Sequence, residues 1–336
     1  PMSRGLGDVY KRQIVIKKRN VLSFDHPVNF GVNMNKLKKI DSLINDAIQN
    51  NMTPGAQLLI AKNSNIVYHK AYGYKTYEKK EKINNNNIYD LASLTKILVS
   101  VPLLLNEFMT NDFDLTTKLS DWFPDKELKN KKDLTVKQLF SHYSGMKSCI
   151  PFYKKTIDSV TNTRINKYYS NKKSQKFPFQ VSDDLYIRNY NDTIFNEIIN
   201  SELSDSLSYV YSDLPYFLLK FYLEKKYQLS LDTQIKNYLY DKIGSTSLTY
   251  KPTNFLDNKL IVPTAVDDYF RFDLLEGHVH DMGAAMLGGV SGHAGLFSNA
   301  EDLAVIMQML LNMGYYGGTQ YLNPATLHKY TCLLYT

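Results

Sequence analysis

The chain has 336 residues, of which 43% are hydrophobic and 22% charged, which is enough to bury a large core in one or two domains. Its net charge of +7 raises nucleic acid as a partner. The lysines, however, are scattered among asparagine, tyrosine and isoleucine, and no stretch resembles a nucleic-acid-binding fold. We therefore expect no nucleic-acid partner.

Membrane insertion and a disulfide framework are also disfavoured. No apolar run reaches the ~18 residues of a membrane span, and the N-terminus shows no secretory signal. The two cysteines, Cys149 and Cys332, are too few for a disulfide framework and form no CxxC or Cys/His cluster. We expect no transmembrane segment, cofactor or metal, and the composition leaves the compartment open.

The two ends of the chain resemble translated adaptor sequence. They read "PMSRGLGDVYKRQ" and "CLLYT". We predict that residues 1–13 and 332–336 are non-native tails and that residues 14–33 form a linker. The natural protein is then expected to extend beyond both ends.

The first predicted elements are a helix and a hairpin. Residues 34–50 repeat apolar side chains at helical spacing. "TPG" at residues 53–55 ends the helix, and two strands at residues 56–61 and 65–74 follow around the turn-rich "KNSN". A helix and a hairpin thus precede every candidate catalytic motif.

The remainder of the chain is predicted to be mainly helical. A helix beginning at Ser93 is apolar nearly all round and is therefore expected to be buried, with a kink or an early-turn position at Pro102. Residues 114–242 suggest a mostly helical insert. Ser298 and Glu301 fit a capping box for a last amphipathic helix.

Ser93 and Lys96 form the first candidate catalytic pair. Residues three apart share a helix face, and burial disfavours a charged amine, so Lys96 could accept the proton of the serine hydroxyl. The helix N-terminus would also favour an oxyanion there. The alternative is a serine helix cap followed by an outward-pointing lysine. Ser144/Lys147 and Ser170/Lys173 repeat the spacing, but they lie in a turn and a polar loop.

Tyr211 and Asp213 are the second candidate pair. An acyl-transfer site needs a group that carries the proton to the leaving atom, and a tyrosine can serve. Asp213 fits a helix N-cap and Pro215 the first turn, so Tyr211 would be held just before a rigid helix.

"GHVHD" offers a competing metal-binding interpretation. His278, His280 and Asp281 could bind zinc, with His293 as a fourth ligand. The simpler interpretation is a loop held by hydrogen bonds of these side chains near the site. His142, in "SHYSG", is interpreted as a structural residue that packs a turn.

Four ordered motifs resemble those of the serine β-lactamase-related family, which includes class C β-lactamases, penicillin-binding proteins and related esterases. The motifs are "YDLASLTK", "LTVKQLFSHYSGM", "YSDLPYFLL" and "GGVSGHAGLFSNAEDLA". The resemblance implies that Ser93 is the acylated nucleophile, Lys96 its base and Tyr211 the proton shuttle. Asp213 stands where many members have asparagine, which weakens a specific claim for β-lactam binding.

The third motif of the family, Lys/His-Thr/Ser-Gly on an edge strand, is not found. His293-Ala294-Gly295 is rejected because a capped helix follows it. We therefore expect the C-terminal strands of the domain at residues 34–331 to be missing. The resemblance is strongest to a subgroup sometimes fused behind a β-N-acetylhexosaminidase-type glycoside hydrolase, and "SFDHPVNFGVN" could be the linker from that partner.

The sequence thus predicts an α+β fold of the β-lactamase/transpeptidase type, with an antiparallel sheet flanked by helices and a helical insert. The expected function is a serine hydrolase that forms an acyl-enzyme with an ester, an amide or a peptidoglycan-derived peptide. Family resemblance implies the periplasm or cell envelope. The alternatives are a non-catalytic module that binds cell-wall fragments and a metallohydrolase using the histidine triplet.

Overall fold

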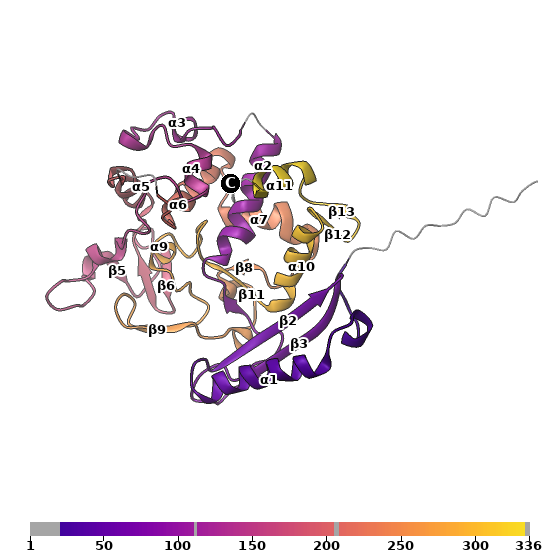
Figure 1. Cartoon of the computed structure of the whole chain (residues 1–336). Helices are drawn as coiled ribbons and strands as arrows, with labels where there is room; N and C mark the ends of the chain where they lie inside the picture. The colour runs from indigo at the N-terminus through magenta and orange to yellow at the C-terminus, as the bar shows by residue number, and fades with distance from the viewer. Residues whose placement is uncertain (1–20, 111–112, 205–207, 333–336) are drawn as a thin grey trace, which may run out of the picture.

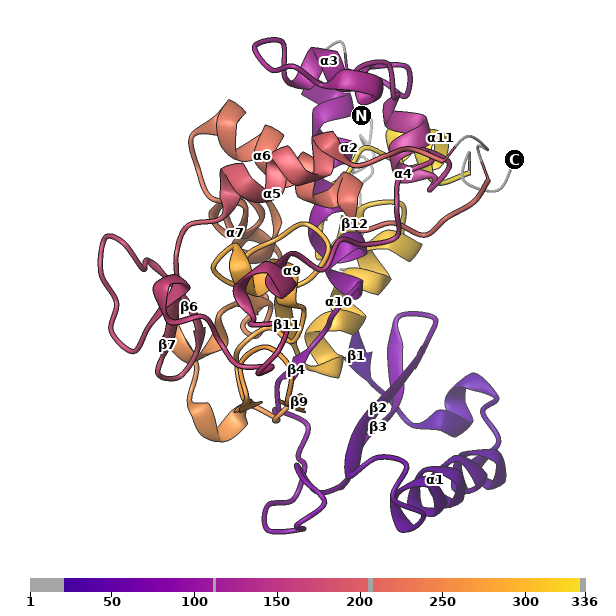
Figure 2. The same ribbon diagram turned by 90° about the vertical axis from the view of Figure 1, so that its left-hand side faces the viewer.

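The computed structural model describes residues 21–110, 113–204 and 208–332. A layer made of one helix and a three-stranded sheet lies against a larger, mainly helical body (Figures 1 and 2). The predictions for residues 1–13 and 333–336 lie outside the described residues. The side chain of Cys332 does too.

The N-terminal layer confirms the predicted helix and hairpin. Helix α1 spans Met34–Gln49, and strands β2 (Gly55–Lys62) and β3 (Asn65–Gly73) are antiparallel. The turn between them places Asn63 and Ser64 at positive φ, which polar turn residues tolerate. Strand β1 (Ser23–Phe24) pairs in parallel with β3, so this part of the predicted linker is attached to the sheet.

A hydrogen-bonded cluster ties α1 to β3. The carboxylate of Asp41 accepts hydrogen bonds from the hydroxyls of Tyr68 and Tyr72 and pairs with Lys70 at 3.0 Å. These donors lower the pKa of Asp41 to about 2. The charge of Asp41 is therefore stabilised at the seam between the helix and the sheet.

The segment from Ser93 is helical, as predicted, but it begins with an unusual turn. Residues Lys96–Ser100 form a π-helix that continues into α2 (Val101–Thr110). Pro102 has no N–H for the carbonyl of Leu98, and the Tyr240 hydroxyl donates to that carbonyl at 3.0 Å instead. The prediction of an all-round buried helix was wrong at three positions, because Leu94, Ile97 and Met109 are exposed.

Three segments far apart in sequence meet beside this helix in a small antiparallel sheet. Strand β11 (Leu296–Ser298) lies between β4 (Tyr89–Asp90) and β8 (Thr249–Tyr250). The sheet joins the residues that precede Ser93 to the C-terminal third of the chain. It thereby fixes the start of the serine-bearing turn.

The predicted helical insert contains helices and an unpredicted sheet. The helices are α3 (Leu119–Trp122), α4 (Val136–Phe140), α5 (Asn191–Asn200), α6 (Leu214–Tyr227), α7 (Leu231–Ile235) and α8 (Asp241–Ile243). The sheet has the order β5-β7-β6, formed by Tyr169–Ser170, Leu185–Ile187 and Phe179–Ser182. These strands are two to four residues long, too short to show a clear alternation of apolar residues.

The C-terminal part completes the body. Its elements are β9 (Ala265–Asp267), β10 (Asp273–Leu275), α9 (Met282–Met286), α10 (Ala300–Leu311), β12 (Tyr315–Tyr316), β13 (Thr319–Gln320) and α11 (Pro324–Cys332). The predicted capping box was wrong by one residue. Asn299 caps α10 by accepting from the Asp302 N–H, while Ser298 bonds to Ser247.

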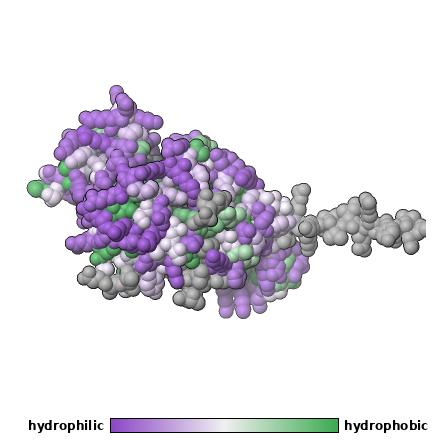
Figure 3. Space-filling model, turned by 90° about the horizontal axis from the view of Figure 1, so that it is seen from above, coloured by the Kyte–Doolittle hydropathy of each residue, from purple (hydrophilic) through white to green (hydrophobic). Residues whose placement is uncertain are grey.

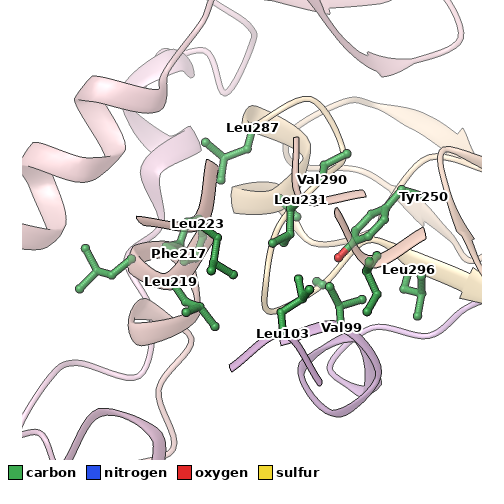
Figure 4. Packing of buried hydrophobic residues seen from close by; sticks show 14 of the residues in the cluster. Val99, Leu103, Phe217, Leu219, Leu223, Leu231, Tyr250, Leu287, Val290 and Leu296 are labelled. Carbon is green, nitrogen blue, oxygen red and sulfur yellow. The ribbon is translucent and has the colours of Figure 1, made fainter. Parts of the chain in front are cut away.

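The core lies between α2, α6 and the sheet formed by β4, β11 and β8. Figure 4 shows Val99 and Leu103 facing Leu296 and Tyr250, with Phe217, Leu219 and Leu223 of α6 beside them. The face in Figure 3 is covered mainly by hydrophilic residues. Among the described residues, no helix combines the length and the hydropathy that a bilayer crossing requires.

Candidate active site

The structure brings the side chains of Ser93 and Lys96 together. The lysine Nζ lies 2.9 Å from the serine Oγ, as the three-residue spacing predicts. Ser93 is exposed, whereas only 4% of Lys96 is accessible. The hydroxyl is therefore open to a substrate while the amine is shielded from water.

The alternative interpretation of Ser93 as a helix cap is not supported. Its side chain contacts Lys96, and the lysine points inward rather than to solvent. The two other Ser-x-x-Lys matches behave differently. The hydroxyl of Ser144 accepts from the backbone N–H of Met146, and that of Ser170 accepts from the N–H of Lys172.

Lys96 is the centre of a wider cluster. Its Nζ lies 2.7 Å from Oδ1 of Asp213 and 3.4 Å from the carbonyl oxygen of His293. The same nitrogen is 4.8 Å from the centre of the Tyr211 ring and 5.4 Å from that of Tyr216. The buried ammonium thus has a counter-ion and two aromatic rings around it.

Asp213 precedes α6 as predicted, but its side chain does not cap the helix. The Ser212 hydroxyl accepts from the Leu214 N–H instead, which leaves the Asp213 carboxylate free to pair with Lys96. The four predicted site residues, Ser93, Lys96, Tyr211 and Asp213, therefore lie together. Their catalytic roles remain predictions.

His142 holds the segment that carries Tyr211. Its Nδ1 accepts from the Ser212 N–H at 3.1 Å, and its ring lies 4.7 Å from that of Tyr211. Burial, reinforced by the charge of Lys96, lowers the pKa of His142 and favours the neutral ring that can accept this bond. His142, which the sequence analysis interpreted as a structural residue packing a turn, therefore lies next to Tyr211, the candidate proton shuttle.

The turn that presents Ser93 is held by Asp90. Ala92 has a φ of 45°, in the left-handed region that a non-glycine residue seldom occupies. The Asp90 carboxylate accepts from the backbone N–H of Ala92 at 2.9 Å and from that of His280 at 2.8 Å. One buried carboxylate therefore ties the serine turn to the loop at residue 280.

His293 and Asp281 also belong to the cluster, and the sequence analysis did not assign them to it. His293 Nε2 lies 2.8 Å from Asp281 Oδ1, and its Nδ1 lies 2.9 Å from the Ser291 hydroxyl. The Phe217 ring stacks on the imidazole at 4.1 Å. His293 and Lys96 lower the pKa of Asp281 although burial opposes them. The "GHAG" match was the available signal, but the sequence analysis considered His293 only as a possible fourth metal ligand and as part of a rejected third motif.

The histidine triplet that was considered as an alternative metal site does not form a metal-ligand group among the described residues. His278 pairs with Asp183 at 3.0 Å, and His280 contributes backbone atoms to Asp90 and Arg271. The described side chains that do converge are those of Asp213, Asp281 and His293, whose ligand atoms lie within 4.8 Å of one another. Asp213 already pairs with Lys96, and His293 already bonds to Asp281. These contacts agree with the simpler interpretation, a loop held by hydrogen bonds near the site.

The fold and this Ser-Lys-Tyr cluster define a serine hydrolase of the β-lactamase-related type. The beta-lactamase family model matches residues 40–332, and the chain belongs to that family. This confirms the resemblance found in the sequence motifs and the predicted α+β fold.

Relatives in the family carry related activities in their names. A protein of Escherichia coli O157:H7, named as a candidate D-alanyl-D-alanine carboxypeptidase, is 30% identical over 94% of this chain and 73% of its own length. An N-acetylmuramyl-L-alanine amidase of Bacillus subtilis is 29% identical over 88% of this chain and 67% of its own length. The octameric penicillin-binding protein homologue of Pyrococcus abyssi shares the fold, with a TM-score of 0.63 and 18% sequence identity. The match covers 87% of this chain and 59% of that protein.

Proposed function

We propose that this chain cleaves an amide bond of a peptidoglycan-derived peptide through an acyl-enzyme on Ser93. The observation that carries the proposal is the 2.9 Å contact between an exposed serine hydroxyl and a buried lysine amine. A lysine so placed can act as the base that a serine nucleophile needs.

In the proposed acylation, Lys96 reacts as the neutral amine. Ser93 Oγ forms a bond to the substrate carbonyl carbon and gives its proton to Lys96 Nζ, which becomes an ammonium. The C–N bond then breaks, and the leaving nitrogen takes a proton relayed by Tyr211, whose ring lies beside the lysine. Water hydrolyses the ester on Ser93 and restores the hydroxyl. Asp213 balances the charge of Lys96 while the proton moves.

The names of the relatives support the choice of substrate. A carboxypeptidase for D-alanyl-D-alanine and an amidase for N-acetylmuramyl-L-alanine are both named for bonds of the bacterial cell wall. We therefore propose a cell-wall peptide as substrate and the cell envelope as the place of action.

Covalent labelling tests the nucleophile and the base. The purified chain is incubated with a fluorescent fluorophosphonate or penicillin, beside Ser93→Ala and Lys96→Ala. We expect label on the unmodified chain and none on either variant. Ser170→Ala is the matched control, because Ser170 has the same spacing to a lysine but bonds to its own loop. Unchanged labelling in Ser93→Ala would refute the assignment.

Asp213 can be tested separately from its neighbours. In Asp213→Asn, the variant has the residue that many family members carry, and acylation should stay within about tenfold of the original rate. Both variants remove the negative charge, but Asp213→Leu also removes the oxygen that accepts from Lys96 Nζ, which leaves a buried polar group without a partner, and it should cost at least about 100-fold. Rates equal to that of the unmodified chain in both variants would show that Asp213 has no part in the reaction.

A further inference from the structure

The loop at residues 291–293 is attached to the core through its backbone. Three consecutive carbonyl oxygens of this loop each accept a hydrogen bond from a buried side chain of another element. The pairs, with the donor first, are Tyr250 and Ser291 at 2.7 Å, Ser100 and Gly292 at 2.7 Å, and Lys96 and His293 at 3.4 Å. The last of these contacts joins the loop to the proposed base.

The side chain of His293 is held on three sides. Its Nε2 lies 2.8 Å from Asp281 Oδ1, and its Nδ1 lies 2.9 Å from the Ser291 hydroxyl. The ring of Phe217 stacks on the imidazole, and only 2% of His293 is exposed. A buried network of this kind restricts the side chain to one orientation, so it also fixes the backbone of the same residue.

Asp281 is anchored in turn by the backbone around it. The Oδ1 atom of Asp281 also accepts from the Ala284 N–H at 2.7 Å, at the start of α9. The preceding residue, His280, donates its backbone N–H to Asp90, which holds the serine turn. The imidazole therefore bonds to a carboxylate that is itself fixed relative to Ser93.

The three polar contacts of Lys96 Nζ differ in what they can donate. The Asp213 carboxylate at 2.7 Å and the His293 carbonyl at 3.4 Å are acceptors only. The Ser93 hydroxyl, at 2.9 Å, also carries a proton. A neutral amine has two N–H bonds and one lone pair. With its N–H bonds directed at the two acceptors, the lone pair is left for the serine proton.

We propose that His293 and Asp281 are positioning residues that direct the lone pair of Lys96 at the Ser93 hydroxyl. Asp281 holds the imidazole, the imidazole fixes the His293 carbonyl, and that carbonyl orients the amine. Neither side chain takes a proton or contacts the substrate in this role. The inference rests on the proposed function, in which Lys96 is the base.

Labelling kinetics test the role of His293. Time courses at several fluorophosphonate concentrations separate the maximal rate of bond formation from the concentration that gives half of it. His293→Leu keeps an apolar contact with Phe217 but removes both polar contacts of the ring. We expect the maximal rate to fall at least about tenfold, while the half-saturating concentration changes by less than about threefold. An unchanged maximal rate in the folded variant would overturn the proposal.

A conservative variant and a matched control separate positioning from folding. The amide of His293→Gln can donate to Asp281 and accept from Ser291, so this variant should react at least about fivefold faster than His293→Leu. His69→Leu changes a partly buried histidine of β3, in the N-terminal layer, and should leave the maximal rate unchanged. Equal losses in His293→Gln and His293→Leu would contradict the role of the imidazole contacts.

A double variant tests whether the two residues act as a unit. Asp281→Ala should also lower the maximal rate at least about tenfold, at a temperature where circular dichroism shows it folded. The combination with His293→Leu should be within about threefold of the slower single variant, because both changes release the same carbonyl. Losses that multiply would show independent effects and overturn the linked arrangement.

Crystal structures separate this inference from the proposed function. In His293→Leu, we expect Lys96 Nζ to move beyond about 3.5 Å from the carbonyl at residue 293 or from Ser93 Oγ, the limit of a hydrogen bond. Both contacts kept as in the unmodified chain would refute the positioning role. If the unmodified chain takes no label, the proposed function fails, and the position of Nζ in the two structures still decides whether His293 orients the amine.

Discussion

Two buried lysines, Lys96 and Lys131, have opposite surroundings. Lys96 meets a serine hydroxyl and the carboxylate of Asp213. Lys131 is fully buried and donates to the side chain of Asn130 and to the carbonyls of Ile199 and Ser201, near the end of α5. Burial lowers the pKa of Lys131 to about 8, and Lys129 and Lys147 add to the effect.

The difference between these surroundings indicates what distinguishes a candidate catalytic lysine from a structural one. Carbonyl acceptors at a helix end use the Lys131 ammonium as a cap, and none of its hydrogen-bond partners among the described residues is a nucleophilic side chain. A hydroxyl open to solvent, a counter-ion and an aromatic neighbour instead create a site in which a proton can move. Burial alone therefore does not identify a catalytic lysine.

The largest expected effect separates the two lysines by reactivity. Lys96→Met should lower the rate of covalent labelling by at least about 100-fold, since it removes the proposed general base. Lys131→Met should leave that rate within about threefold at a temperature where the variant is folded. Rates from time courses of fluorophosphonate labelling measure both. A similar loss of labelling rate in both folded variants would contradict the distinction between Lys96 and Lys131.

The second prediction concerns the stability supplied by Lys131. Lys131→Met leaves two carbonyls without their donor and should cost about 1–3 kcal/mol of unfolding free energy. Because the folded pKa of about 8 lies below the unfolded value of 10.5, the unfolded chain holds the extra proton between these values. The contribution of Lys131 to stability should therefore rise with pH over that window, by no more than about 3 kcal/mol.

Urea titrations at several pH values between 7 and 10 measure this effect. The quantity to compare is the difference in unfolding free energy between the unmodified chain and Lys131→Met, because the tyrosines titrate in both proteins and cancel in this difference. We expect the difference to change with pH. A difference that stays constant across the window would contradict the lowered pKa.

A third prediction extends the comparison to His142, which supports Tyr211 rather than the lysine. His142→Phe keeps the packing on the Tyr211 ring but removes the acceptor of the Ser212 N–H. We expect acylation to slow about tenfold, because small displacements of a catalytic group are costly. The original chain should also lose stability as pH falls below 6.5, since the unfolded histidine then binds a proton that the folded one resists. His142→Phe should lack this component.

The smallest effect is expected far from both lysines, at Asp41. Its pKa of about 2 lies below the ordinary aspartate value of 3.8, so its stabilising effect should be present above pH 4 and lost as pH falls toward 2. The loss should not exceed about 2 kcal/mol. Acid denaturation of Asp41→Asn should lack this component while labelling at pH 7 is unchanged. An identical acid transition in both proteins would contradict it.

The sequence predicted best what depends on local spacing. Ser93 and Lys96 meet because they lie three positions apart on one helix face, and the helix at residues 34–50 follows from its apolar repeat. Leu94 and Ile97 were predicted wrongly because tertiary contacts, not hydrophobicity, decide which side of a helix is covered. His293 and Asp281 reach the site through an irregular loop, which has no periodicity to read.

The contacts that build the serine turn join distant parts of the chain. The Asp90–His280 bond spans 190 residues, the contact from Lys96 to the His293 carbonyl spans 197, and the bond from the Leu296 N–H to Thr95 spans 201. Contacts of such separation form late in folding because each must first close a long loop. On a ribosome, we therefore expect the proposed nucleophile to acquire these contacts only after about 200 further residues have emerged, and the nascent chain to be unreactive until then.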